Sequence, residues 1–369
     1  MKLIPAFLCI LLAVPALARQ PQDPIASANQ GTVGVITGME GGTYARTAAD
    51  LTILDSDTLR VLPTLGKGSL QNLSDILYLK GIDIGFVQAD ALTYAKRHNM
   101  FPDLVQGILY IAKLYDEEIH VIARKDIKQL KDLNDQRVNV DVVGSGSAMT
   151  AEIVLSELGI NAKVEHEKQV TGVDELKHGD IAAIIHVGGA PIPLFADLPA
   201  DSGIHFLPVA IDQALLSQGY LPAEFTHQNY PLLIPEGARV PTIAVGDVMA
   251  VYAWPRHTAR YNKVARFVDA FFSRFDEFQK PPRHPKWREV NLAAQVPGWT
   301  RFAPAQEWLD QKAATVAAND NLQTDFNRFI AVKLSNGEIT TSERDLLFKQ
   351  FLQWRNQQLS SGSAVARQR

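Results

Sequence analysis

The sequence predicts an α/β protein whose two lobes share a cleft. Apolar β-branched segments alternate with segments of helical periodicity, glycine-rich turns open several of those helices, and the alternation starts again near residue 119. Hydrophobic residues make up 46% of the 369 residues and charged residues 21%, which excludes wholesale disorder. The net charge of -4, without a basic stripe, excludes a nucleic acid as the main partner.

The N-terminal segment has the pattern of a cleaved signal peptide. Lys2 precedes the apolar run Leu3–Val14, and Ala16 and Ala18 are the small residues that a signal peptidase requires. We expect cleavage after Ala18, because the run is too short to span a membrane. The one cysteine of the sequence, Cys9, lies in this segment, so we expect the exported chain to have no disulfide. The predicted localisation is the periplasm.

The first α/β unit follows a polar linker. Its predicted strands are Thr32–Thr37, Leu59–Thr64, Asp83–Gln88 and Gly107–Lys113. Its predicted helices are Thr43–Leu54, Ser69–Lys80 and Ala89–Arg97. Strands that alternate with helices at this spacing predict a largely parallel sheet.

The second unit repeats this order, and helix then dominates the rest of the chain. We expect strands at Ile119–Ala123, Val138–Val142, Lys163–His166, Ile181–Ile185 and Ile204–Leu207. A helix is expected over Ser147–Leu158, ended by Gly159. From Thr258, apolar residues at helical spacing predict a core-facing helix, and we expect the later helices to pack on the first lobe.

These patterns divide the chain into five parts. They are a signal peptide (1–18), the first part of lobe 1 (31–117), lobe 2 (118–255), the completion of lobe 1 with a helical extension (256–359), and a disordered tail (360–369). We expect the chain to cross between the lobes at Tyr115–His120 and Val251–Pro255, where a few residues can act as a hinge.

Glycine-rich turns at helix starts carry the clearest chemical signal. Four of them occur, at Gly41-Gly42-Thr43-Tyr44, Gly68-Ser69-Leu70-Gln71-Asn72, Gly144-Ser145-Gly146-Ser147 and Gly188-Gly189-Ala190-Pro191. A helix start presents unpaired N–H groups and a partial positive charge, so it attracts carboxylates and phosphates. Ligands of open α/β sheets lie at the carboxyl ends of strands, where all four turns belong. Two turns come from each lobe, which predicts a cleft that receives an anion.

The order of these motifs resembles the TAXI family of solute receptors of TRAP transporters. The resemblance runs through residues 31–255, and its most specific strings are Asp83-Ile84-Gly85-Phe86-Val87-Gln88-Ala89-Asp90 and Gly144-Ser145-Gly146-Ser147. It implies a two-lobed periplasmic binding protein of the type II fold, with a hinge-closing cleft and, here, a helical C-terminal extension. The implied function is capture of a small organic anion (a dicarboxylate, a keto acid or an amino acid such as glutamate) for delivery to TRAP membrane subunits. The receptor itself would be soluble and dock at the inner-membrane transporter.

The resemblance also implies a set of ligand-binding residues. They are Gly42, Thr43, Tyr44, Ser69, Asn72, Gln88, Tyr115, Ser145, Gly146, Ser147, Gly189 and Pro191. Hydroxyls, amides and backbone N–H groups of this kind suit a carboxylate or a carbonyl. Asp90, which follows a strand, is expected to cap the next helix instead.

Two other function classes stay open at this point. A periplasmic enzyme, for example one that resembles a dehydratase, can share the two-lobed scaffold, and a receptor of this kind can also serve an ABC permease or a sensor kinase. The expected site holds no acid or base, which favours binding over catalysis. Gly66-Lys67-Gly68-Ser69 departs from the phosphate-loop pattern, because Gly68 separates Lys67 from Ser69, and the histidines show no metal-ligand spacing. We therefore expect no catalytic residue, no cofactor and no metal.

Overall fold

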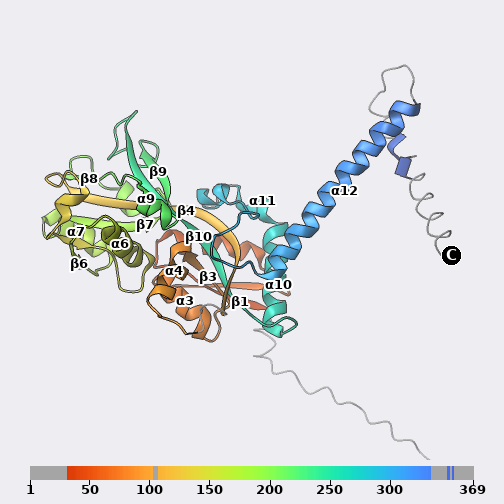
Figure 1. Ribbon diagram of the computed structural model, residues 1–369, viewed down its shortest axis with the longest axis horizontal. Helices are drawn as coiled ribbons and strands as arrows, with labels where there is room; N and C mark the ends of the chain where they lie inside the picture. Colours follow the sequence, from red (N-terminus) through yellow and green to blue (C-terminus); the bar gives the residue numbers. More distant parts are fainter. Residues whose placement is uncertain (1–30, 103–106, 334–346, 350, 353–369) are drawn as a thin grey trace, which may run out of the picture.

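The computed structural model describes residues 31–102, 107–333, 347–349 and 351–352. It shows a mixed α/β protein of two lobes joined by two long strands (Figure 1). The α/β two-lobed fold expected from the sequence is therefore confirmed. The expected signal peptide (1–18) and C-terminal tail (360–369) lie outside the described residues.

Lobe 1 contains one end of a continuous ten-stranded sheet. Its strands follow in the order β2 (Arg60–Thr64), β1 (Thr32–Ile36), β3 (Ile84–Gln88), β10 (Arg239–Tyr252) and β4 (Ile108–Arg124). β1 pairs in parallel with β2 and β3, whereas β10 runs antiparallel to β3 and β4. The first three of these strands lie where the alternating sequence pattern predicted them.

Helices cover both faces of the lobe 1 sheet. One face packs against α3 (Ser69–Tyr78) and α4 (Ala89–Arg97). The other face packs against α2 (Thr43–Asp50), the 3₁₀ helices η1 (Leu51–Leu54) and η3 (Pro285–Glu289), α10 (Ala259–Ser273) and α11 (Phe275–Phe278). The predicted apolar stripe of α10 is buried, with Phe267 and Phe271 fully inside, and the Thr258 hydroxyl caps the helix by accepting from Tyr261 N–H.

Lobe 2 continues the same sheet beyond β4. Its strands are β7 (Ala183–Gly188), β5 (Arg137–Asn139), β6 (Lys163–Glu165), β8 (Ile204–Phe206), which pairs with β4, and β9 (Leu221–Thr226), which pairs with β10. Its helices are η2 (Leu130–Leu133), α6 (Gly146–Glu157), α7 (Gln169–His178), α8 (Pro193–Ala196) and α9 (Gln213–Ser217). α6 and α9 share one core cluster and α7 and α8 another, so helices again cover both faces.

β4 is one strand of 17 residues where the sequence predicted two strands, Gly107–Lys113 and Ile119–Ala123. The acidic triplet Asp116-Glu117-Glu118 interrupts the apolar pattern in a way that is typical of a turn. In the structure each of these carboxylates has a partner, so the strand continues through the triplet. The partners are Lys113, Tyr44 and Lys286, respectively.

The second crossing lies earlier in the chain than expected. Residues Arg239–Ala244 of β10 pair with β9 in lobe 2, and Asp247–Val251 pair with β3 in lobe 1. The chain therefore passes between the lobes near Val245–Asp247, whereas we expected the passage at Val251–Pro255. A continuous run of apolar residues hid the crossing, because a strand buried in either lobe has the same pattern.

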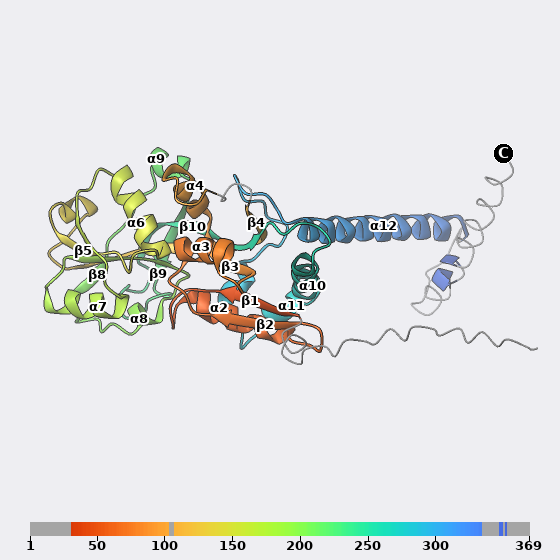
Figure 2. The same cartoon turned by 90° about the horizontal axis from the view of Figure 1, so that it is seen from below.

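The C-terminal extension packs on lobe 1 only at its start. Helix α12 (Ala303–Lys333) begins beside the buried residues Phe302 and Ala305, and Trp308 and Leu309 pack partly against the same core. Beyond them the helix projects away from both lobes, and its residues 311–317 are exposed (Figures 1 and 2). The expectation that the extension packs on lobe 1 is therefore wrong for most of α12. No helix of the described residues is long and apolar enough to cross a membrane.

Candidate functional site

Three neighbouring strands of lobe 1 each carry a buried polar residue where the chain approaches lobe 2. They are Gln88 on β3, Asp247 on β10 and Glu117 on β4, and they are 1%, 0% and 3% exposed. We call these three residues the polar row. Gln88 and Asp247 are direct partners in the antiparallel ladder, and the strand order β3-β10-β4 places Asp247 between the other two.

All three residues of the polar row lie on one face of the sheet. Side chains two positions apart on a strand share a face. The residues two positions away from the row are Phe86, Met249 and Tyr115, and all three belong to the core cluster that α2 and α10 cover. The row is therefore the polar end of that apolar core, at the boundary between the lobes.

A β-bulge adjusts the strands beside Asp247. Gly246 pairs with Asp116 and Val248 pairs with Lys113, which leaves two residues of β4, Leu114 and Tyr115, opposite Asp247. Bulges re-aim side chains and are frequent beside functional sites. The Tyr115 side chain is fully buried, and its hydroxyl has no hydrogen-bond partner among the described residues.

The two carboxyl groups of the row differ in their partners. The Tyr44 hydroxyl donates to Glu117 Oε2 over 3.0 Å, whereas neither oxygen of Asp247 has a hydrogen-bond partner among the described residues. Burial raises the pKa of Glu117 to about 8. Burial, together with the neighbouring Glu117, raises the pKa of Asp247 well above its usual range. Both groups therefore favour the protonated, neutral form.

Lysines near the row are committed to other carboxylates. Lys113 pairs with Asp116 over 2.5 Å, on the same strand as Glu117. Lys286, on η3, pairs with Glu118 over 2.7 Å and with Glu289 over 2.9 Å. Within the described part of the chain, no lysine or arginine forms an ion pair with the row itself.

Ser69 and Asn72, both predicted as ligand-binding residues, hold β3 and Gln88 in place. Ser69 Oγ donates to Gln88 Oε1 over 2.9 Å and accepts from the Gln88 backbone N–H over 3.0 Å. Asn72 Nδ2 donates to the Phe86 carbonyl over 2.7 Å. Gln88 Nε2 has no partner among the described residues, so this amide keeps a donor for a further group.

The start of α6 brings lobe 2 against this region. Ser145 Oγ accepts from Ala148 N–H over 3.1 Å as the helix cap, and Ser147 Oγ accepts from Val187 N–H over 3.0 Å. Both hydroxyls, predicted to bind a ligand, are thus engaged within lobe 2. The N–H groups of Gly146 and Ser147 precede the first helical hydrogen bonds, so they stay available.

Gly146 is the point of closest approach to lobe 1. A Cβ at this position would lie 1.8 Å from Gln88 Oε1 and 2.7 Å from Ser69 Oγ. Beside it, Gln71 N–H donates to the Gly144 carbonyl across the lobe boundary over 3.1 Å. The absence of a side chain at Gly146 therefore lets the helix start reach the polar row.

The remaining predicted residues lie further from the contact between Gln88 and Gly146. Gly42 caps α2 ahead of the buried Thr43, and a Cβ at Gly189 would lie 3.2 Å from Thr43 Cγ2. Glu118 Oε2 fixes the loop after Gly189 by accepting from Ala190 N–H over 2.7 Å. Pro191 is exposed. The structure thus places Tyr44, Gln88, Tyr115 and Gly146 together, with the others behind or beside them.

Sequence reasoning missed Glu117 and Asp247 as site residues. Asp247 is a single acid inside the apolar run from Ile243 to Tyr252, and Glu117 lies two positions after Tyr115 in a strand pattern. An acidic side chain in the middle of a buried strand costs free energy unless it has a role. That signal was present in the sequence.

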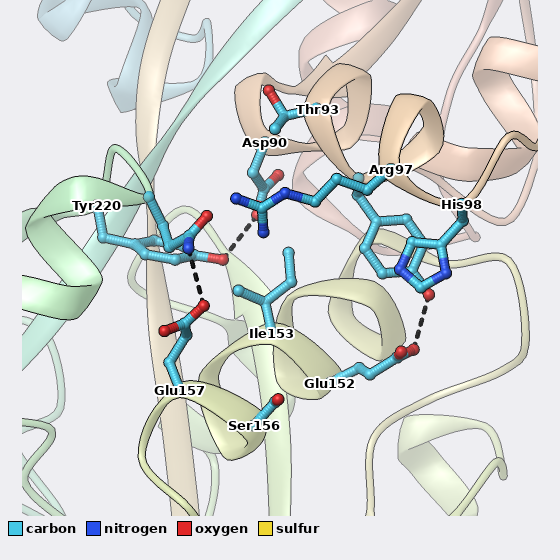
Figure 3. A pocket seen from close by; sticks show the side chains of 11 residues that line it. Asp90, Thr93, Arg97, His98, Glu152, Ile153, Ser156, Glu157 and Tyr220 are labelled. Carbon is cyan, nitrogen blue, oxygen red and sulfur yellow. Dashed lines mark hydrogen bonds between the residues drawn. The ribbon is translucent and has the colours of Figure 1, made fainter.

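A separate hollow of about 200 Å³ lies between α4 of lobe 1 and α6 of lobe 2. Figure 3 shows Asp90, Arg97 and His98 on the α4 side of this hollow and Glu152 and Glu157 of α6 on the opposite side. None of the twelve predicted ligand-binding residues lines it. Asp90 does not cap its helix as expected, because it instead accepts from the hydroxyls of Thr150 and Tyr220 in lobe 2.

Known structures and families offer matches to this chain. A solved periplasmic transporter is 11% identical to this protein. The match covers 80% of this chain and 97% of the transporter chain, with a TM-score of 0.47. An ancestral arginine-binding protein bound to arginine is 16% identical, covering 70% and 97%, with a TM-score of 0.39. A TctC solute binding protein from Polaromonas is 15% identical, covering 72% and 91%, with a TM-score of 0.37. The family model described as NMT1-like family matches residues 35–297, more than half of the chain, so this protein belongs to the NMT1-like family.

Proposed function

We propose that this protein is a periplasmic solute receptor, which binds a small organic anion between its lobes and delivers it to a TRAP-type transporter. The observation that carries the proposal is the polar row with the adjacent Tyr115. Gln88 Nε2, Tyr115 Oη and both Asp247 oxygens are buried there without a hydrogen-bond partner among the described residues. Buried polar groups of native proteins are nearly always hydrogen-bonded, and an exception calls for an explanation. A ligand that bonds to these groups supplies one.

The start of α6 provides a place for the carboxylate of such a ligand. Gly146 and Ser147 present backbone N–H groups at the positive end of a 12-residue helix. Gln88 Nε2, directly across the lobe boundary, adds a side-chain donor. A carboxylate between these donors would contact both lobes at once.

The connection between the lobes suits a receptor that closes on its ligand. β4 and β10 are the two strands that run through both lobes, and the loop contacts beside them join glycines, such as Gly68 and Gly146. A hinge at these strands needs changes of φ and ψ at only a few residues. The difference between open and closed surfaces would let a membrane partner distinguish the loaded receptor.

The resemblance to TAXI receptors supports TRAP membrane subunits as the partner, and the predicted signal peptide supports the periplasm. A receptor for an ABC permease or a sensor kinase is the alternative partner assignment. Co-purification with membrane subunits encoded beside the gene separates these assignments, because a TRAP system predicts a TRAP permease among them.

A ligand screen tests the receptor function. The protein is heated with dicarboxylates, keto acids and amino acids, and a ligand present at 100 times its Kd should stabilise the fold by about 2.7 kcal/mol. Small-angle scattering should then show a smaller radius of gyration with that ligand. Gln88→Ala should abolish the thermal shift, whereas Gln71→Ala, whose side chain bonds to Lys67 and Asp75 instead, should preserve it. If no compound of the panel binds, the proposal is wrong.

Catalysis is a second candidate, and one observation favours it. Glu117 combines burial between the lobes with a pKa of about 8, the range in which a carboxyl group can act as a general acid or base near neutral pH. Proton NMR of a bound ligand, followed over hours with the protein present, distinguishes the two functions. A receptor leaves the ligand unchanged, whereas an enzyme converts it and loses this conversion in Glu117→Gln.

A further inference from the structure

We infer that Asp247 and Glu117 bind a protonated amine of the ligand, so that the receptor selects amine-bearing carboxylates over their hydroxyl analogues. The inference rests on the proposed function and adds a second charged group to the ligand. It places that group at the end of the polar row opposite the donors of Gln88 and α6.

The first step is the contrast with other buried carboxylates of this chain. Asp83, fully buried, pairs with Lys263 over 2.7 Å, and the largely buried Glu118 pairs with Lys286 over 2.7 Å. Asp247 is as deeply buried as Asp83, yet neither of its oxygens has a hydrogen-bond partner among the described residues, and no lysine or arginine of that part of the chain forms an ion pair with it. Tyr44 and Lys113 act on it only by lowering its pKa against the larger effect of burial. Asp83 and Glu118 thus each have a cationic partner within the chain, whereas Asp247 forms no ion pair with the described residues.

The second step is that the acids do not stand alone. Within the described part of the chain, the buried hydroxyl of Tyr115, on the strand next to Asp247, has no hydrogen-bond partner. The same holds for the amide nitrogen of Gln88, the ladder partner of Asp247. Asp247 interacts electrostatically with Tyr44 and Tyr115 as well as with Glu117. The carboxyl oxygens of the polar row, the Tyr115 hydroxyl and the Gln88 amide nitrogen therefore lie in one region.

An ammonium group fits this set better than a metal ion does. It has three donors, which the oxygens of Asp247, Glu117 and Tyr115 can accept. The described residues include no group of three or more His, Cys, Asp or Glu side chains that could hold a metal ion.

Binding of an amine would also resolve the charge state of the row. Without a cation, burial favours the neutral carboxyl forms. The groups that interact electrostatically with them are Tyr44 on α2, Tyr115, Glu118 and Lys113 on β4, Asp90 on α4 and Lys286 on η3. An ammonium ion beside the carboxyls lowers their pKa, so they ionise and release protons. Amine binding should therefore strengthen as the pH rises from 5 to 8.

Matched ligand pairs test the inference. The full chain is titrated calorimetrically with L-aspartate and L-malate, L-glutamate and L-2-hydroxyglutarate, and L-alanine and L-lactate, each pair differing only by amine against hydroxyl. Calcium chloride is titrated as a separate arm. We expect one amine member to bind and its hydroxyl partner to bind at least about tenfold more weakly, since the buried acids would lose their cation.

Charge-neutralising variants then assign the amine to the polar row. Asp247→Asn and Glu117→Gln should each lower the affinity for the amine ligand by about 30-fold or more. Asp116→Asn is the matched control, because it removes a carboxylate from the same strand on the opposite face, where it pairs with Lys113. It should leave the affinity within about twofold.

The outcomes separate this inference from the proposed function. If only hydroxyl members bind, or if Asp247→Asn keeps the amine affinity, the inference is overturned while the receptor function stands. If calcium binds and Asp247→Asn abolishes its binding, the row is a metal site and the inference is overturned. If no member of any pair binds, the inference is overturned, and the wider ligand screen, which includes keto acids, decides whether the receptor function stands.

Discussion

Two places between the lobes bury a carboxyl group, and the two groups are partnered in opposite ways. Between α4 and α6, one oxygen of Asp90 accepts from Thr150 and Tyr220 of lobe 2, each over 2.9 Å. In the polar row, Asp247 has no hydrogen-bond partner for either oxygen among the described residues. The difference indicates that the first group links the lobes to each other, and it is the reason that we propose a ligand as the partner of the second.

The pKa values follow the same contrast. Burial raises the pKa of Asp90 to about 6, against the lowering influence of its two hydroxyl donors. Burial and the nearby Glu117 raise the pKa of Asp247 well above its usual range. Unsatisfied groups of this kind cost stability, and proteins tolerate that cost where a site needs it. On this account, the polar row is a destabilised site and the Asp90 contact is a stabilising one.

The largest expected effect comes from a methyl group at the lobe contact. Gly146→Ala would place Cβ 1.8 Å from Gln88 Oε1, so either the lobes separate or the Gln88 amide is displaced. Both results remove contacts that the ligand needs, and we expect an affinity loss of about 100-fold by calorimetry. Gly38→Ala is the control, because its Cβ would meet Tyr44 at an ordinary 3.4 Å. Equal affinity of the two variants would show that the ligand binds elsewhere.

The second largest expected effect is a difference in unfolding free energy between variants of the two carboxyl groups. Asp247→Asn should raise the unfolding free energy of the ligand-free protein at pH 7.5, because the native state no longer buries an acid without a partner. Asp90→Ala should lower it, because the hydroxyls of Thr150 and Tyr220 lose their acceptor. Chemical denaturation should separate the two variants by about 4 kcal/mol. If both variants changed the unfolding free energy in the same direction, the proposed difference between the two carboxyl groups would be wrong.

The smallest expected effect is the pH dependence that Asp90 contributes. Its pKa is raised in the folded protein from 3.8 to about 6, so its stabilising contribution is complete below pH 4 and is lost as the pH rises to 6. Relative to Asp90→Asn, the wild type should lose up to about 2 kcal/mol of unfolding free energy between pH 4 and pH 7. Parallel profiles of the two proteins would contradict a buried, titrating Asp90.

The order of strands and helices could be predicted because it depends on residues that are close together in the sequence. Strand and helix periodicity, with caps such as Thr258 and Ser145, placed the elements and the two lobes. The continuity of β4 could not be predicted, because it depends on partners from distant segments. Glu118, for example, needs Lys286, which lies 168 residues further along the chain.

The sequence predicted the glycine-rich turns of the candidate site and some of the side chains beside them. Tyr44, Gln88, Tyr115 and Gly146 were expected in the site, and the structure places them in one region; their contact with a ligand stays a prediction. The hydroxyls of Ser145 and Ser147 are engaged inside lobe 2, which only the packing of α6 on β7 reveals.

Glu117 and Asp247 were missed for a related reason. Whether a lone acid in a strand is neutralised by a neighbour or left unpartnered depends on the register of three strands, and a single sequence does not contain that register.

Proton release on ligand binding tests the central claim most directly. The amine-bearing ligand from the paired titrations is measured at pH 7 in phosphate and in Tris, whose different heats of ionisation reveal the number of protons exchanged. The account predicts release of at least about one proton, because an ammonium ion ionises carboxyl groups of the polar row, of which Glu117 has a pKa of about 8, and a smaller release in Glu117→Gln, where only Asp247 can ionise. Binding without proton exchange in the wild type, or equal release in Glu117→Gln, would contradict it.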